Sequence, residues 1–177
     1  QSKEPKPEHI WIASFDIGKN NFAFCIEEMD PRKATTKIKN TKDVVYKKQL
    51  DETALLNGEM IVMENVSITK NCKTKGFDPQ LFKNMNEVLE KFGSYFRHCS
   101  HIVIEEQMSF GRNINVQALK LGQHCYSWFL IRFPLTTIHS FHAYHKTQVL
   151  CSPVKLTKPE RKKWSVQEAK RILELRG

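Results

Sequence analysis

Several features are missing from this sequence, and each absence removes a class of protein. No run of about 18 apolar residues occurs, so a membrane-spanning helix is not expected. The opening segment Gln1–Pro7 is polar and contains two prolines, unlike the apolar centre of a secretory signal. We therefore expect a soluble protein with no membrane partner and with a flexible leader over residues 1–9.

Cysteine pairs at metal or redox spacing are also absent. The five cysteines are Cys25, Cys72, Cys99, Cys125 and Cys151. Their number is odd and none belongs to a Cys-x-x-Cys pair, so free thiols in a reducing, intracellular compartment are expected. Cys99 lies near His98 and His101, but no second pair at zinc spacing accompanies them, which argues against a zinc site.

Acidic residues are few relative to basic ones. Lys and Arg number 28 against 19 Asp and Glu, which gives a formal net charge of +9 and an isoelectric point near 9.3. Such a balance favours an anionic partner, nucleic acid before a membrane surface. Between Arg32 and Lys48 the net charge is 7 − 1 = +6. A solvated loop is the simpler role for this segment, and contact with phosphates is the alternative.

The chain opens with the pattern of a β-hairpin. Ile10–Phe15 is expected to form a strand, Asp16–Asn20 a tight turn, and Asn21–Ile26 the returning strand. Asp16 at the lip of this hairpin, close to Gly18, is suited to hold a metal or to face a phosphate. An aspartate that merely forms the turn is the alternative.

A second carboxylate follows a strand in the middle of the chain. Ile102–Ile104 has the composition of a central strand covered on both faces, and such strands present functional residues at their carboxyl ends. Glu105 occupies that end, whereas Glu106 is expected to point to the opposite face. An ordinary surface carboxylate is the simpler interpretation of Glu105.

Helical and further strand patterns complete the chain. They predict strands at Val44–Tyr46, Met60–Met63 and Leu135–His139, and helices from Asp78 to Phe96, from Ile114 to Arg132, and from a Trp164–Ser165–Glu168 capping box to Arg176. The resulting β-β-(β)-α-β-α-β-α order is that of the α/β ribonuclease H-like fold, with a mixed five-stranded sheet flanked by helices. We expect one such domain over residues 10–177, with a basic insertion at about 32–76.

Three short segments resemble the signatures of the poxvirus-type Holliday junction resolvases, a viral branch of the RuvC-like nucleases. They are Phe15-Asp16-Ile17-Gly18-x-Asn20, Val103-Ile104-Glu105-x-Gln107 and Lys162-Lys163-x-Ser165-Val166. The stretch Ala143–Gln148 is similar to the lysine-bearing loop of bacterial RuvC. The resemblance spans most of the chain from Ile10 onward and is weakest over residues 32–76. It implies an endonuclease that resolves four-way DNA junctions by paired, metal-dependent nicks.

Residue by residue, the resemblance implies roles for two carboxylates and several lysines. Asp16 and Glu105 would be ligands of Mg²⁺, for which Mn²⁺ would substitute. Lys163 would face the scissile phosphate, with Lys146 as a second candidate, and Lys162 would replace Lys163 if the register is off by one. Non-specific phosphate contact is the simpler role for these lysines. The implied DNA contacts are Lys19, Lys146, Arg161, Lys162 and Lys163.

The resemblance also implies a homodimer, because a junction needs two symmetric nicks. The predicted helix from Ile114 to Arg132 is apolar nearly all round, so either a second copy or the rest of the monomer must cover its outer side. One departure from the family is clear. The family completes its site with an aspartate pair on a later helix, and no Asp follows Asp78 here. With two of about four carboxylates, these 177 residues are expected to bind metal weakly and to cleave slowly or not at all.

Two other interpretations remain open. The segment Asp16–Asn20 also resembles the first phosphate loop of the actin and Hsp70-like ATPases, although a second glycine-rich phosphate loop is lacking and the chain has only seven glycines. The other is a non-catalytic nucleic-acid-binding module, which the missing carboxylates would suit. If the source is a virus, we expect the protein at replication sites in the host cytoplasm or nucleus.

Overall fold

The computed structural model describes residues 4–34, 54–73, 78–107, 115–143, 152 and 156–177. The chain divides into two compact units by its internal contacts. One is formed by Gln1–Glu28 with Met60–His142, and the other by Met29–Glu59 with Ala143–Gly177. The prediction of a single domain over residues 10–177 stays a prediction.

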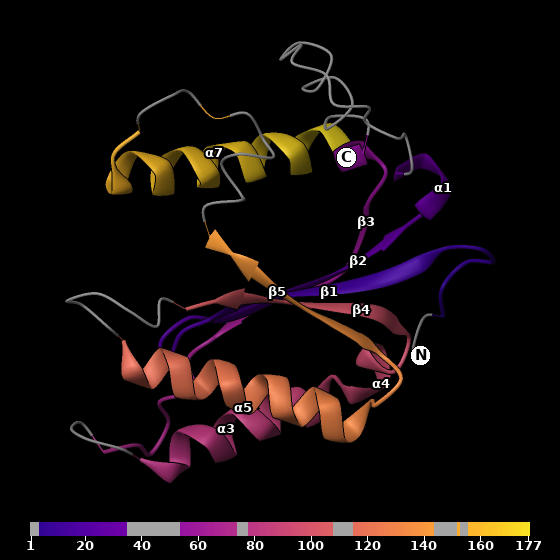
Figure 1. The fold of residues 1–177 in the computed structure, drawn as a ribbon. Coiled ribbons are helices and arrows are strands. Elements are labelled where there is room, and N and C mark those ends of the chain that lie inside the picture. The colour runs from indigo at the N-terminus through magenta and orange to yellow at the C-terminus, as the bar shows by residue number, and fades with distance from the viewer. Residues whose placement is uncertain (1–3, 35–53, 74–77, 108–114, 144–151, 153–155) are drawn as a thin grey trace. The chain divides into compact units, whose positions relative to one another are not determined.

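A five-stranded mixed sheet dominates the first unit, with the strand order β3-β2-β1-β4-β5. β1 pairs in parallel with β4, and β4 pairs in parallel with β5 (Figure 1). The predicted sheet of five strands is therefore confirmed, while the predicted strand at residues 44–46 lies outside the described residues. The strands are β1 (Ile10–Ile17), β2 (Phe22–Met29), β3 (Glu59–Val66), β4 (Cys99–Glu106) and β5 (Thr137–His142).

The hairpin between β1 and β2 is present, but its turn begins two residues later than predicted. Asp16 lies inside β1, and the turn spans residues 18–21. The strand continues because Ile17 is 2% exposed and belongs to the core. The Gly18 amide donates to the Asn21 carbonyl at 3.2 Å, and a Cβ at Gly18 would lie 3.3 Å from the same oxygen. Glycine therefore keeps this turn tight.

Alternate residues of the strands form an aromatic core beneath α3 (Pro79–Lys91) and α5 (Val116–Arg132), which cover one face of the sheet (Figure 1). Phe15 lies at its centre, with its ring 5.3 Å from that of Phe129 and 5.6 Å from that of Phe96, measured between centroids. Ile102 and Ile104 of β4 are buried in the same cluster. This packing fixes which face of β1 and β4 points inward.

The first covering helix is shorter than predicted. α3 ends at Lys91, and a separate short helix, α4 (Gly93–Phe96), follows it. Phe92 breaks the helix because its backbone leaves the helical region, with φ −104° and ψ 9°, ahead of a glycine, which is a poor helix former. The N-terminus is as predicted, since the Asp78 carboxylate accepts the Gln80 amide at 2.9 Å and Pro79 occupies the first turn.

The second covering helix buries one stripe of small and large apolar residues. The buried members of α5 are Ala118, Leu121, Cys125 and Phe129. Near its C-terminal end, Ile131 is 82% exposed, and Leu135 in the following loop is 98% exposed. The prediction that this helix needs cover on a second side therefore stays open, with apolar side chains exposed at its end. Among the described helices, none combines the length and the hydropathy of a membrane span.

The second unit contains α1 (Pro31–Ala34) and the C-terminal helix α7 (Lys158–Arg176). The predicted start of α7 at the Trp164–Ser165–Glu168 capping box is wrong by about two turns. The capping box is formed instead by Thr157 and Glu160, whose carboxylate accepts the Thr157 amide at 2.7 Å. A proline at the second helical position suits this earlier start, because proline needs no amide partner there.

Candidate functional site

The two predicted carboxylates lie at the carboxyl ends of two hydrogen-bonded parallel strands. The pairing of β1 with β4 runs through Phe15 opposite Ile104. Asp16 and Glu105 are the next residue on each strand, and both strands continue past them. Adjacent strands lie about 4.8 Å apart. The fold therefore brings together two acidic residues that are 89 positions apart in the sequence.

Both carboxylates point to the face of the sheet away from α3 and α5. Side chains alternate along a strand, and Phe15 and Ile104 are buried under those helices. The next residues, Asp16 and Glu105, must then occupy the opposite face. Asp16 is exposed and Glu105 is half-buried. A cation on this face would have access to both side chains and to solvent.

The pairing of β4 with β5 shows that Glu105 and Glu106 have different neighbours. In the pairing of β4 with β5, Phe141 stands opposite Glu105, and His142 stands opposite Glu106. The Glu106 carboxylate lies 3.1 Å from Nδ1 of His142 on the helix-covered side of the sheet. Glu106 therefore faces away from Asp16, as the alternation of side chains predicts, and Glu105 alone joins it.

The donor set fits a hard divalent cation. Mg²⁺ prefers oxygen ligands, and proteins usually hold it by one or two carboxylates while waters and substrate phosphates complete its shell. Asp16 and Glu105 supply two such carboxylates on one face. Within the described residues, no group of three or more His, Cys, Asp or Glu is arranged to hold a metal. The described residues thus offer a cation one pair of carboxylates, Asp16 and Glu105.

The basic residues predicted to contact DNA fall into three groups. Lys19 is exposed in the turn that directly follows β1, three residues after Asp16. Arg161, Lys162 and Lys163 are all exposed in the first two turns of α7, in the second unit. Lys146 lies outside the described residues. The structure thus brings Lys19 to the same strand end as Asp16 and places three basic side chains in a row on one helix.

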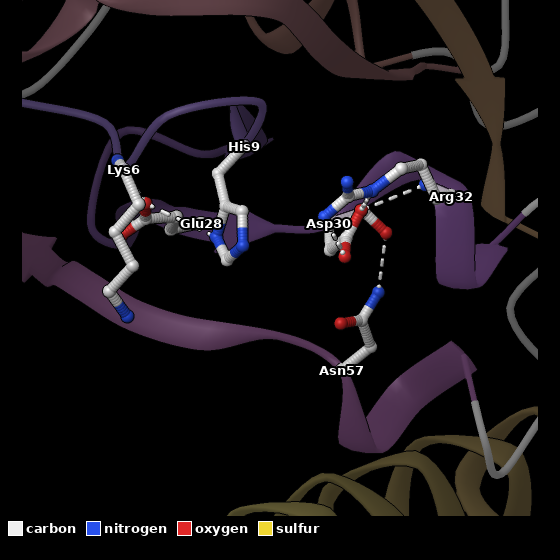
Figure 2. A network of polar contacts seen from close by, with 6 residues as sticks. All are labelled: Lys6, His9, Glu28, Asp30, Arg32 and Asn57. Carbon is white, nitrogen blue, oxygen red and sulfur yellow. Dashed lines mark hydrogen bonds and ion pairs between the residues drawn. The ribbon is translucent and has the colours of Figure 1, made fainter.

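Two buried carboxylates that sequence reasoning did not single out have structural partners (Figure 2). Glu28, 4% exposed, accepts the Lys6 amide at 2.6 Å and lies 3.4 Å from Nδ1 of His9. Asp30, 5% exposed, receives Nε and Nη2 of Arg32, each at 2.9 Å. Both carboxylates are thus satisfied within the protein, and we assign them to stability.

Sequence reasoning also missed a cavity at the same end of the sheet as Asp16. It is lined by three lysines, Lys19, Lys73 and Lys120, which come from three separate segments. The one available signal was a lysine just after the first turn of a helix that has no acidic residue in that turn. That signal is weak without the fold.

No family model matches the sequence. It is similar to uncharacterized protein 97L of Invertebrate iridescent virus 3, with 29% identity over 92% of this chain and 85% of that protein. It is also 32% identical to uncharacterized protein 170L of Invertebrate iridescent virus 6, over 83% of this chain. The chain spans 61% of the length of that second relative. Its relatives in sequence are thus viral proteins.

Among solved structures, the chain is similar to RuvC of Thermus thermophilus. The TM-score is 0.53, the identity is 12%, and the likeness covers 85% of this chain and 75% of that one. At this identity the likeness concerns the fold alone. Together with the mixed five-stranded sheet and its flanking helices, it confirms the predicted α/β ribonuclease H-like fold.

Proposed function

We propose that this protein is a metal-dependent endonuclease that resolves four-way DNA junctions by paired nicks. The observation that carries the proposal is the position of Asp16 and Glu105, side by side at the carboxyl ends of two parallel strands and on one face. The nuclease fold likeness and the formal charge of +9 support it. The viral relatives suit a role at sites of viral DNA replication in the host cytoplasm or nucleus.

In this proposal Asp16 and Glu105 hold Mg²⁺, and Mn²⁺ substitutes for it. When bound, the ion supplies charge neutralisation at the scissile phosphate. Two adjacent carboxylates would otherwise repel that phosphate, so the site needs a cation before DNA can approach. Lys163, or Lys146 in its place, faces the phosphate and stabilises the charge that develops there. Lys162 takes this role if the register is shifted by one.

DNA binding in this proposal depends mainly on phosphate contacts. Lys19, Arg161 and Lys162 track the backbone and carry no sequence information by themselves. Affinity should therefore fall steeply with salt and vary little with sequence, while the preference for junctions comes from their shape. A linear duplex and a four-way junction of matched composition measure these two contributions separately.

A homodimer completes the proposal, since two symmetric nicks need two active sites. The exposed apolar side chains near the end of α5 suit such an interface: Leu130 is 47% exposed, Ile131 82% and Leu135 98%. Exposed apolar patches of this kind mark association surfaces. We expect a dimer by analytical ultracentrifugation at micromolar concentration, and a monomer for the double variant Ile131→Lys, Leu135→Lys. A monomeric parent protein would contradict this part.

The test of cleavage uses a labelled four-way junction under single-turnover conditions with Mg²⁺. We expect slow, symmetric nicks that EDTA abolishes, because the part of the chain that the structure describes brings two carboxylates together, and the resembled family uses about four. Asp16→Asn and Glu105→Gln should each lower the rate about 100-fold or more. Glu106→Gln is the matched control, because Glu106 faces the other side, and it should retain the parental rate. Equal rates in Asp16→Asn and the parent would reject the proposal.

A non-catalytic nucleic-acid-binding module is the second candidate, favoured by one observation. The described residues hold no group of three metal-binding side chains. A module would bind junctions tightly with or without Mg²⁺ and would never nick them. If the parent protein nicks junctions, and Asp16→Asn still binds them but no longer nicks them, the result would favour the enzyme instead. Absence of any thermal shift with ATP would set aside the remaining ATPase interpretation.

A further inference from the structure

A cavity of about 570 Å³ lies in the first unit, at the end of the sheet where β1 turns into β2. Its walls come from that turn, from the segment after β3, and from the first turns of α3 and α5. Small-molecule sites in proteins usually have about 300–1,000 Å³. This cavity is therefore large enough for a ligand the size of a nucleotide, and no role has yet been assigned to it.

The charge lining the cavity is positive. Lys19, Lys73 and Lys120 line it together with one acidic residue, Asp78, so its net charge is 3 − 1 = +2. Asp78 is 7% exposed, and its carboxylate accepts the backbone amides of Lys73 and Gln80. These amides lower the pKa of Asp78, so it stays ionised as a helix cap. The lysines thus define the charge offered to a ligand.

The N-terminus of α5 adds to this positive field, whereas the Asp78 carboxylate already caps the N-terminus of α3. Val116 and Gln117 open α5 at the cavity wall. α5 has no acidic residue in its first turn, and Lys120 is the fifth residue of that helix. A helix N-terminus carries about half a positive charge and favours anions.

The cavity is held in shape by hydrogen bonds between its walls. The Ile68 amide donates to the Lys19 carbonyl at 2.9 Å, which ties the segment after β3 to the hairpin turn. The buried Asn84 donates to the carbonyls of Ile68 and Lys70, each at 2.8 Å. The Lys73 amide donates to Asp78. The backbones that carry Lys19 and Lys73 are therefore fixed before any ligand arrives, which lowers the cost of binding.

One wall of the cavity is apolar. It consists of Leu81, Phe82 and Val116, of which Val116 is 55% exposed. Basic side chains beside an aromatic and aliphatic wall suit a nucleotide, whose phosphate is anionic and whose base has an apolar face. A simple inorganic anion has no apolar surface that could pack against this wall.

We propose that this cavity binds one nucleotide of a DNA strand. The lysines contact its phosphate, and the base or sugar lies against Phe82 and Val116. Its placement along the cleaved strand rests on the proposed function. Asp16 and Lys19 are three residues apart, at most about 11 Å of extended chain. Asp16 points away from α3 and α5, so a strand with one phosphate at Asp16 would pass around the end of the sheet to place a later nucleotide in the cavity.

The test measures DNA binding without cleavage, in EDTA, with the full chain. The probes are a fluorescent single strand of roughly 12 nucleotides, thymidine monophosphate and inorganic phosphate. Lys73→Gln and Lys120→Gln should each weaken binding of the oligonucleotide about five- to tenfold and lower the salt slope by about one. Lys83→Gln, on the same helix as the cavity wall but outside the lining, is the matched control and should change the affinity less than about twofold.

A second pair of variants separates binding from folding. Val116→Glu places a negative charge in the cavity, at the first position of α5 where a glutamate favours the helix. Its melting temperature should not fall, while binding of the oligonucleotide should weaken by about tenfold or more. Val116→Gln removes the same apolar contact without adding a charge, so it should weaken binding clearly less than Val116→Glu does.

The outcomes distinguish the sources of the phosphate. Weaker oligonucleotide binding in Lys73→Gln, Lys120→Gln and Val116→Glu, with Lys83→Gln unchanged, supports the inference. Unchanged oligonucleotide binding, with phosphate or thymidine monophosphate binding lost, would assign the cavity to a free anion and overturn it. No change with any probe in Val116→Glu would overturn it as well. If the variants lose oligonucleotide binding as expected but the parent never nicks a junction, the inference about the cavity holds and only the proposed cleavage is rejected.

Discussion

The two faces of β1 and β4 differ completely, although they are built from alternate residues of the same strands. On one face, Phe15 and Ile104 are 3% and 5% exposed and are packed beneath α3 and α5. On the other face, the next residues, Asp16 and Glu105, are carboxylates that reach solvent. The first face stabilises the fold, and the second face carries the two carboxylates proposed to bind a cation.

The difference shows how a core positions a site that it does not touch. A shift of one residue in strand pairing would move every side chain to the other face, so a buried face fixes the register. Phe15 opposite Ile104 is part of that register. The proximity of Asp16 and Glu105 is then a consequence of the aromatic packing on the far side. Variants on the two faces should therefore fail in different ways.

The largest effect is expected on the covered face. The centroid of the Phe15 ring lies 5.3 Å from the ring centroids of both Phe24 and Phe129. Phe15→Ala removes this ring and leaves a cavity. The free energy of unfolding should fall by about 3–5 kcal/mol, measured by chemical denaturation. Phe15→Leu is the milder control and should lose clearly less. A loss below about 1 kcal/mol for the alanine variant would mean that Phe15 does not anchor the core.

Thiol chemistry gives a second contrast between the faces. Burial raises the pKa of Cys99 to about 12 from an ordinary value of 9.0, and it also raises the pKa of the fully buried Cys125. Because the thiolate is the reactive form, the raised pKa of Cys99 makes this thiol much less reactive at neutral pH. Alkylation at pH 8, followed peptide by peptide with mass spectrometry, should modify Cys25 on the open face before either. Adding denaturant should remove the difference, and equal rates in the native protein would contradict the assignment.

A smaller effect is expected where α3 begins. The pKa of Asp78 lies below its ordinary value of 3.8, because the amides of Lys73 and Gln80 stabilise the carboxylate. Its contribution is therefore fully present above that value and is lost as the pH falls through the lower folded pKa. The melting temperature of the parent should fall more steeply below pH 4 than that of Asp78→Asn, since asparagine keeps a neutral cap. Parallel curves for both proteins would show that this carboxylate does not contribute to acid sensitivity.

The carboxylate pair could be predicted from the sequence because each member follows an apolar strand. The order of elements then makes both strands parallel and central, and their carboxyl ends meet. Local boundaries were harder. The strand was expected to end at Phe15, but burial of Ile17 extends it through Asp16. Tertiary packing thus overrode the turn signal of Asp16 and Gly18.

The cavity could not be predicted, because its lysines are contributed by positions 19, 73 and 120. Each is an ordinary exposed lysine in its own segment, and only the fold gathers them. The start of α7 shows a different kind of error. Two capping boxes compete in that segment, and Thr157 with Glu160 prevails over Ser165 with Glu168. Glu168 instead pairs with Arg171 at 2.6 Å, one turn further along the helix. Both boxes satisfy the same sequence rule, so the pattern alone does not decide between them.

The smallest effect has an unusual sign and tests whether the open face was shaped for a ligand. Like charges on facing positions of neighbouring strands cost about 0.2–1 kcal/mol, so Asp16→Asn should raise the melting temperature in EDTA. Glu106→Gln should not, because it removes the partner of His142. Adding Mg²⁺ or Mn²⁺ should stabilise the parent but neither Asp16→Asn nor Glu105→Gln. If Asp16→Asn melted below the parent in EDTA, the Asp16 carboxylate would be structural, and its proximity to Glu105 would no longer argue for a cation. If the carboxylates of Asp16 and Glu105 instead destabilise the fold until Mg²⁺ or Mn²⁺ binds, cation binding is the reason for their proximity.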